Sequence, residues 1–288
     1  RDRDIGSKKN LFGFSFYSIS RFRTFFIVFF SNLKILNSQQ IGTGNKNIII
    51  LHGFLGMGDN WKTLAIRFVN LGYQLHLIDQ RNHGRSFHNP IFNYDVMALD
   101  LEAYCKFYKL YNCILLGHSM GGKTSMRFSV LYPYRVQKLI VVDIAPRFYP
   151  RHHQHILNGL SSLDFLVIKT RKQADVKLSE FVTDLAVRQF LLKNLYWQSK
   201  ERLAFRFNLK DLKINIGEVG KSLSADCKIM VPSLFLRGSR SDYISSNDQE
   251  QISNQFVNSS LCTISNTGHW LHAEKPNVFF EEVANFLS

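Results

Sequence analysis

The sequence predicts an α/β fold built on a doubly wound, mostly parallel β-sheet. Short apolar runs alternate with stretches of helical periodicity ten or more residues long, and this alternation is typical of βαβ units. The runs are nearly continuous, as expected for strands buried on both faces. The chain has 288 residues, of which 45% are hydrophobic and 20% are charged. It is therefore long enough for a sizeable core, as one large domain or as a domain plus a lid.

The first half of the chain shows the alternation most clearly. Its apolar runs and helical spacings follow one another closely, and Pro133 ends the last of its helices. The expected elements are an edge strand within 34–41, strands at 47–51, 73–78 and 113–116, and helices at 61–70, 93–108 and 120–132. The spacing of apolar residues predicts the core-facing side chains of the first two helices. These are Trp61, Leu64, Ala65 and Phe68, followed by Val96, Leu99, Ala103 and Phe107.

The rhythm changes after a buried strand at 139–142. From there to about Met230, helical patterns and polar links dominate without strand–helix alternation. An insertion of this kind next to a sheet edge indicates a small helical cap. The sheet then resumes with strands at 232–236 and 261–264 and helices at 248–256 and 277–287. We expect a core formed by 34–146 and 231–288 and a cap formed by 147–230.

Residues 1–33 are expected to lie outside the fold as a poorly ordered N-terminal extension or leader. The segment is basic and contains the apolar run Phe25 to Phe30. This run is far shorter than the roughly 20 residues of a membrane helix, so no stable membrane span is expected. It resembles the apolar part of a signal peptide or an organelle leader.

The chain is strongly basic, with a formal net charge of +14. The positive electrostatic field of such a chain favours anionic partners, namely nucleic acid, an acidic membrane surface or phosphorylated substrates. The sequence shows neither an RNA-binding signature nor zinc-ligand spacing, which argues against nucleic-acid binding and a metal site. The basic residues are scattered, and one loose concentration falls in the cap. It consists of Lys169, Arg171, Lys172, Lys177, Arg188 and Lys193.

The four cysteines form no Cys-x-x-Cys pair. We expect buried free thiols in a reducing compartment, which favours a cytoplasmic location. Targeting to an organelle, or secretion by an N-terminal leader, stays open.

The segment Gly117–Gly121 is the clearest chemical motif. Its order of strand, Gly-x-Ser-x-Gly and helix is that of a nucleophile elbow, in which the serine lies on a sharp strand-to-helix turn. The flanking residues are glycine because any side chain there would collide with the neighbouring strand or helix. The motif predicts Ser119 as a nucleophile. The backbone N–H of Met120 then points to where an oxyanion would form.

A serine nucleophile needs a base and an acid. His269 follows the last predicted strand and fits the order Ser, acid, His of α/β-hydrolases. Asp143 and Asp242 each follow a strand, and position alone does not decide between them. The loop His52–Gly56 supplies the second half of an oxyanion hole through the N–H of Phe54.

From about Lys34 to the C-terminus the chain resembles a YbfF-type esterase of the α/β-hydrolase superfamily. The resemblance implies the α/β-hydrolase fold with a small cap, hydrolysis of short- or medium-chain acyl esters and of acyl-CoA thioesters, and no cofactor. It also implies Asp143 rather than Asp242 as the acid. The matching stretches are His52–Gly56, Arg81–Gly84, Gly117–Lys123, Asp143–Pro146, Arg206–Leu209 and Gly268–Pro276.

The function that these motifs predict is that of a serine hydrolase acting on a small acyl ester or thioester. Two alternatives remain open. One is a C–C bond hydrolase or lyase that uses the same three residues. The other is a non-catalytic receptor that binds a small ligand under its cap. Haloalkane and epoxide hydrolysis are excluded because they need a carboxylate where Ser119 stands.

Overall fold

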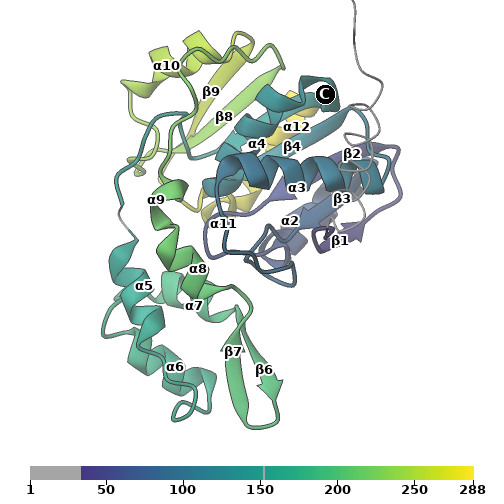
Figure 1. Ribbon diagram of the computed structural model, residues 1–288. Coiled ribbons are helices and arrows are strands. Elements are labelled where there is room, and N and C mark those ends of the chain that lie inside the picture. The colour runs from purple at the N-terminus through teal and green to yellow at the C-terminus, as the bar shows by residue number, and fades with distance from the viewer. Residues whose placement is uncertain (1–33, 152) are drawn as a thin grey trace, which may run out of the picture. The chain divides into compact units, whose positions relative to one another are not determined.

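The computed structural model describes residues 34–151 and 153–288, and residues 35–288 form one compact unit. Our expectation for the N-terminal extension therefore lies outside the described residues. The described part contains a seven-stranded sheet in the order β1-β3-β2-β4-β5-β8-β9 (Figure 1). All pairings are parallel except that of β1, which runs antiparallel to β3 at one edge. The strands are β1 (Ser38–Ile41), β2 (Lys46–Leu51), β3 (Tyr73–Ile78), β4 (Cys113–His118), β5 (Val136–Val142), β8 (Ser233–Gly238) and β9 (Ser259–Ile264).

Helices cover both faces of the sheet. Successive strand residues point to opposite sides, so each strand contributes side chains to both covered faces. In β2, Ile49 and Leu51 join one buried cluster and Ile48 and Ile50 join the other. The first cluster contains residues of α3 (Tyr94–Phe107), α4 (Met120–Leu131) and α10 (Asp248–Gln255). The second contains residues of α2 (Lys62–Val69) and α12 (Pro276–Leu287). Three short pieces complete this part, namely η1 (Gly58–Trp61), η2 (Pro133–Arg135) and α11 (Leu271–Glu274). The predicted α/β fold class is confirmed.

The predicted inner face is right for the first helix and wrong at two of four positions in the second. All four residues predicted for the first are buried. In α3, however, Leu99 and Phe107 are 50% and 62% exposed. The acidic residues of α3 explain the difference, because two of them are buried in ion pairs. Asp100 pairs with Arg81 at 2.5 Å, and Glu102 pairs with Arg135 at 2.9 Å.

The segment between β5 and β8 is mainly helical and has its own buried cluster. It also contains an antiparallel hairpin that the sequence analysis did not predict. Phe54, Leu55 and Met120 contribute to the same cluster, so this segment packs against the loops around Ser119. We refer to residues 147–230 as the cap. Its elements are α5 (Gln154–Ser161), α6 (Arg171–Leu178), α7 (Leu185–Leu192), β6 (Leu195–Ser199), β7 (Arg202–Phe205), α8 (Leu209–Ile214) and α9 (Ile216–Val219).

All four cysteines are free thiols, two of them buried and two half-buried. Within residues 34–151 and 153–288, every helix is too short or too polar to cross a bilayer.

Candidate active site

Ser119 lies on the sharp turn between β4 and α4, in a backbone conformation that side chains rarely adopt. Its φ is 52° and its ψ is −116°. The N–H of Ser119 donates to the carbonyl of Val142 at 2.9 Å, which ties the turn to the neighbouring strand. A Cβ atom on Gly117 would lie 2.3 Å from the carbonyl oxygen of Gly121, and one on Gly121 would lie 2.2 Å from that of Leu51. Only glycine therefore permits this turn.

His269 lies in the loop after β9 and is held on several sides. Its ring stacks on Tyr243 with centroids 3.8 Å apart. Its Nδ1 donates to the Asp143 carboxylate at 2.8 Å. The Nε2 of His118, the neighbour of Ser119, lies 2.9 Å from the backbone carbonyl of His269. Stacking and two hydrogen bonds therefore fix the ring and the main chain at this position.

Asp143 is the carboxylate that meets His269. It directly follows β5, has a φ of 51° and is fully buried. Its Oδ1 accepts the backbone N–H of Gly238 at 3.0 Å, and its Oδ2 also accepts the Ser241 hydroxyl. Burial raises the pKa of Asp143 to about 7, while these two hydrogen bonds oppose the shift because they stabilise the charged form. Asp242 is exposed, and its carbonyl accepts a hydrogen bond from Arg147 at 3.2 Å.

The loop after β2 lies directly against Ser119. A Cβ atom on Gly53 would lie 2.7 Å from Nδ1 of His118 and 3.5 Å from Cβ of Ser119. The loop turns sharply, because the N–H of Gly56 donates to the Gly53 carbonyl at 3.0 Å. Phe54 occupies this turn. Met120 is the first residue of α4, where backbone N–H groups have no acceptor inside the helix. Both predicted oxyanion donors therefore come from segments next to Ser119.

Two cavities meet beside His269. One, of about 190 Å³, is lined by Ser119 and His269 and by apolar side chains of the cap, among them Val187 and Phe190. The other, of about 620 Å³, shares His269 and Phe190 but not Ser119, and it includes the charged Arg240 and Glu274. Ser119 and His269 thus open onto a small, mainly apolar cavity beside a larger one whose lining also includes charged side chains.

Sequence reasoning missed three side chains that hold the site together, namely His118, Ser241 and Tyr243. His118 belongs to the elbow motif, and its position next to Ser119 is a signal for contact with the site. Burial keeps the pKa of His118 well below its usual value, so its ring is neutral. Ser241 and Tyr243 flank Asp242, and no sequence pattern distinguishes them. Their contacts depend on the fold alone.

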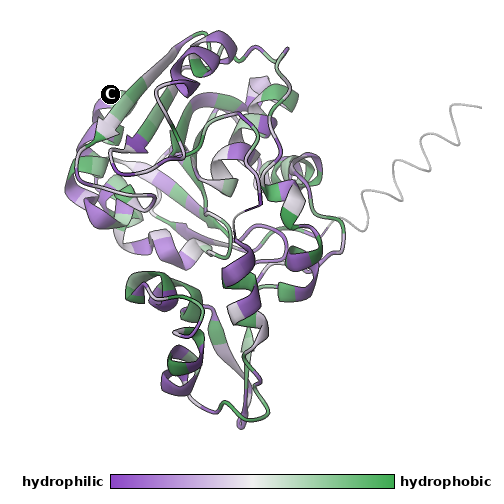
Figure 2. Cartoon of the chain, turned by 90° about the vertical axis from the view of Figure 1, so that its left-hand side faces the viewer, coloured by the Kyte–Doolittle hydropathy of each residue, from purple (hydrophilic) through white to green (hydrophobic). Residues whose placement is uncertain are grey.

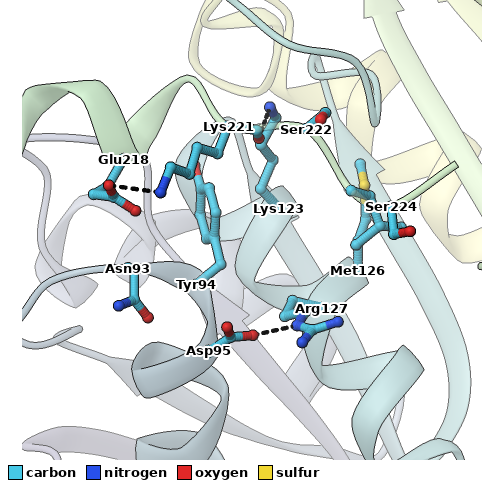
Figure 3. A pocket seen from close by; sticks show the side chains of 11 residues that line it. Asn93, Tyr94, Asp95, Lys123, Met126, Arg127, Glu218, Lys221, Ser222 and Ser224 are labelled. Atoms are coloured by element: carbon cyan, nitrogen blue, oxygen red, sulfur yellow. Dashed lines mark hydrogen bonds and ion pairs between the residues drawn. The ribbon is translucent and has the colours of Figure 1, made fainter.

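A separate polar pocket of about 380 Å³ lies between α3, α4 and the chain after α9 (Figure 3). Its cationic side chains already have partners. Arg127 pairs with Asp95 at 2.5 Å, and Lys221 pairs with Glu218 at 2.8 Å. Lys123 donates to three backbone carbonyls. Ser119 does not line this pocket; it lines the cavity of about 190 Å³ described above.

Comparison with known proteins supports the family and the fold. A family model described as alpha/beta hydrolase fold matches residues 46–166. Esterase YbfF of Escherichia coli is 32% identical over 85% of this chain and 94% of its own length. The sn-1-specific diacylglycerol lipase ABHD11 of Mus musculus is 34% identical over 84% of this chain and 80% of its own. The solved structure of a marine microorganism esterase superposes with a TM-score of 0.85 at 38% identity, over 88% of this chain and 99% of that one.

Fold and site together define an α/β-hydrolase. The chain belongs to that superfamily and, within it, to the YbfF-type esterases. Membership supports the hydrolysis of a small-molecule ester.

Proposed function

We propose that this protein is a serine esterase that cleaves short- to medium-chain acyl esters, and acyl-CoA thioesters, through an acyl-enzyme on Ser119. The observation that carries the proposal is the strained φ of 52° at Ser119 beside the hydrogen-bonded pair of His269 and Asp143. A backbone held in such a conformation costs free energy, and strain of this kind clusters at reactive sites.

The proposed reaction begins with attack of the Ser119 hydroxyl oxygen on the acyl carbonyl carbon. His269 takes the hydroxyl proton and later gives it to the leaving alcohol or thiol, so that the acyl group stays on Ser119. The negative oxygen of the tetrahedral intermediate accepts the N–H groups of Phe54 and Met120. Water, deprotonated by His269, then attacks the acyl-enzyme and releases the acid.

Asp143 has a positioning role in this proposal. Its bond to Nδ1 keeps the proton on that nitrogen, which leaves Nε2 free to act as the base. The carboxylate also stabilises the imidazolium that forms when His269 takes the proton.

The acyl chain length that we propose for the substrate follows from the cavity that Ser119 lines. The cavity is small, which favours a short or medium acyl chain. Its lining is mainly apolar, which favours an apolar chain over a polar one. The larger cavity lacks Ser119 and combines apolar side chains with the charged Asp184, Arg240 and Glu274, so it can accept a leaving group that carries polar groups. Esters and CoA thioesters of increasing acyl length are the substrates that test this part of the proposal.

The proposal is tested with Ser119→Ala. We expect this variant to lose turnover of p-nitrophenyl acyl esters and labelling by a fluorophosphonate while keeping its circular dichroism spectrum. Ser222→Ala, which removes a hydroxyl from the separate polar pocket, is the matched control and should retain both activities. Residual ester turnover in Ser119→Ala would contradict the proposal. Turnover of diketones but not of esters by the wild type would favour a C–C bond hydrolase, and the absence of labelling would favour a receptor.

A further inference from the structure

Three large apolar side chains stay exposed at one end of the cap. Leu166 and Val167 lie in the turn between α5 and α6, and Trp197 lies on β6. They are 69%, 72% and 55% exposed. Single exposed apolar residues are normal on a protein surface, but a group of them marks an interaction site. In Figure 1, α6 and the β6–β7 hairpin lie at the end of the cap far from the sheet, and Figure 2 shows hydrophobic and hydrophilic stretches side by side there.

The turn and the hairpin are held next to each other by direct contacts. The Phe165 ring meets the Phe205 ring of β7 edge to face, with centroids 5.2 Å apart. Lys169 Nζ lies 3.4 Å from the carbonyl of Glu201 at the hairpin tip. The Arg171 guanidinium donates to the carbonyls of Leu192 and Leu195 at 2.6 Å each. The two segments therefore form one continuous surface.

Trp197 is exposed although the hairpin itself is anchored. In the hairpin register Trp197 lies opposite Leu203, and Leu203 is buried. The Phe205 side chain is half-buried and stacks on Phe207 with centroids 4.5 Å apart. The fold thus fixes the backbone that presents the indole to solvent, which lowers the entropy cost of binding through it.

The exposed apolar residues are surrounded by cations. Segments 164–172 and 195–205 carry the basic residues Lys169, Arg171, Lys172, Lys200 and Arg202 against the acidic residues Asp164 and Glu201. Oδ1 of Asp164 already accepts the N–H of Leu166 at 2.8 Å. In the part of the chain that the structure describes, Lys169, Lys172, Lys200 and Arg202 form no ion pair with a carboxylate, and all four are exposed.

We propose that this surface, called the distal cap surface and made of Leu166, Val167, Trp197, Lys169, Lys172, Lys200 and Arg202, binds the headgroup region of an anionic lipid membrane. An indole is amphipathic and prefers the membrane–water interface. Lysine and arginine next to it are attracted to a negatively charged leaflet. The contact that we propose is made by side chains of a folded surface, so it is a peripheral attachment to the headgroup region.

The distal cap surface is linked along the chain to the cavity that Ser119 lines. Helix α7, which contributes Val187, Phe190 and Leu191 to that cavity, leads directly into β6. Binding through the cap therefore holds Ser119 near a lipid phase, where acyl esters are concentrated.

The test is co-sedimentation of the full chain with vesicles of phosphatidylcholine alone or with about 30% phosphatidylserine. We expect binding to the anionic vesicles only, and its loss at about 0.5 M NaCl. Each basic residue near an anionic surface strengthens binding about fivefold, so the triple variant Lys169→Gln, Lys200→Gln, Arg202→Gln should bind on the order of 100-fold more weakly. Trp197→Ser should bind about tenfold more weakly.

Matched controls separate this surface from general charge and exposure. The triple variant Lys46→Gln, Lys62→Gln, Lys109→Gln removes the same charge from exposed positions outside the cap. Phe107→Ser removes an aromatic side chain of similar exposure from α3. Both should bind anionic vesicles about as well as the wild type, and all variants should keep wild-type activity on a water-soluble ester.

Three results would overturn the proposal. The first is equal binding to neutral and anionic vesicles, or to neither. The second is wild-type binding by Trp197→Ser and by the cap triple variant. The third is a wild-type dimer in light scattering that Trp197→Ser dissociates, without vesicle binding, because the surface would then join two copies of this chain. None of these results depends on whether Ser119 is the nucleophile.

Discussion

His269 and Asp143 form a hydrogen bond of 2.8 Å although the strands that precede them are not neighbours in the sheet. Asp143 directly follows β5 and His269 follows β9, and β8 lies between these two strands. The end of β8 and the loop that follows it also contact Asp143. The N–H of Gly238 and the hydroxyl of Ser241 both donate to the Asp143 carboxylate. The loop that carries the alternative acid, Asp242, therefore holds Asp143 in place.

Asp143→Asn should lower kcat for a p-nitrophenyl acyl ester by about 10⁴, because an amide would favour the wrong tautomer of His269. Asp242→Asn is the matched control. Its side chain is exposed, and we expect kcat within about twofold of the wild type. Steady-state kinetics on both variants, with circular dichroism to verify folding, make the comparison. A large loss in Asp242→Asn with little loss in Asp143→Asn would reverse the assignment.

The activity should fall as the pH drops below about 7, because burial raises the pKa of Asp143 to about 7 and only its ionised form stabilises the imidazolium of His269. The hydrogen bond from Ser241 lowers that pKa. Ser241→Ala should therefore move the acidic limb of kcat/KM to higher pH.

Profiles of kcat/KM from about pH 5 to about pH 9 measure this shift. Ser239→Ala is the control, because the Ser239 hydroxyl accepts the N–H of Asn266, whereas the Ser241 hydroxyl donates to Asp143. If the acidic limb stayed in place in Ser241→Ala, a group other than Asp143 would control it.

Local sequence patterns were sufficient to predict most of the fold and the turn around Ser119. Continuous apolar runs located all the core strands, since parallel strands buried on both faces leave little room for polar side chains. The strand-turn-helix order at Ser119 predicted a sharp strand-to-helix turn, and the structure has this turn. These features depend on neighbours in the sequence.

Features that depend on distant residues did not follow from local sequence patterns. Position along the chain left Asp143 and Asp242 both open as the partner of His269, and only the family resemblance favoured Asp143. The physical reason lies in the positions of β5 and β8 relative to β9. The inner face of α3 was wrong because buried ion pairs, not apolar spacing, decide it. The β6–β7 hairpin was missed because its turn, Lys200 and Glu201, lacks the glycine or asparagine that marks a tight hairpin turn.

His118 should act as a positioning residue for His269. Its ring is neutral, so Nε2–H donates to the His269 carbonyl. We expect His118→Ala to lower kcat about tenfold to 100-fold with little change in KM, because a shift of about 1 Å at the base costs that much. His118→Gln, whose amide N–H also donates, should recover part of the loss.

His76→Ala is the control for His118→Ala, since His76 is equally buried in β3 but bonds Tyr104 and Asn47, away from the site. A rise in KM with unchanged kcat in His118→Ala would contradict the positioning role and indicate a contact with substrate.

Lys123 should make the stability of the fold depend on pH above neutrality. It lies on α4 and donates to the carbonyls of Arg147, Gly220 and Lys221 at 2.7, 3.2 and 2.5 Å, which joins both ends of the cap to the helix that follows Ser119. Burial, with a smaller effect of Arg147, lowers the pKa of Lys123 to about 7, against about 10.4 in an unfolded chain. Between these values the unfolded state binds more protons, so the free energy of unfolding contributed by Lys123 rises with pH.

Lys123→Met should remove this rise and should destabilise the fold by about 1–3 kcal/mol, because three buried carbonyls lose their donor. Urea unfolding at several pH values between about 7 and about 9 measures both effects, as the difference between wild type and variant. That difference should grow with pH. Lys138→Met, which removes an ammonium group bound to the carbonyls of Phe286 and Leu287, is the control for lost hydrogen bonds. A difference for Lys123→Met that stays constant with pH would show that Lys123 keeps its proton in the folded state throughout this range.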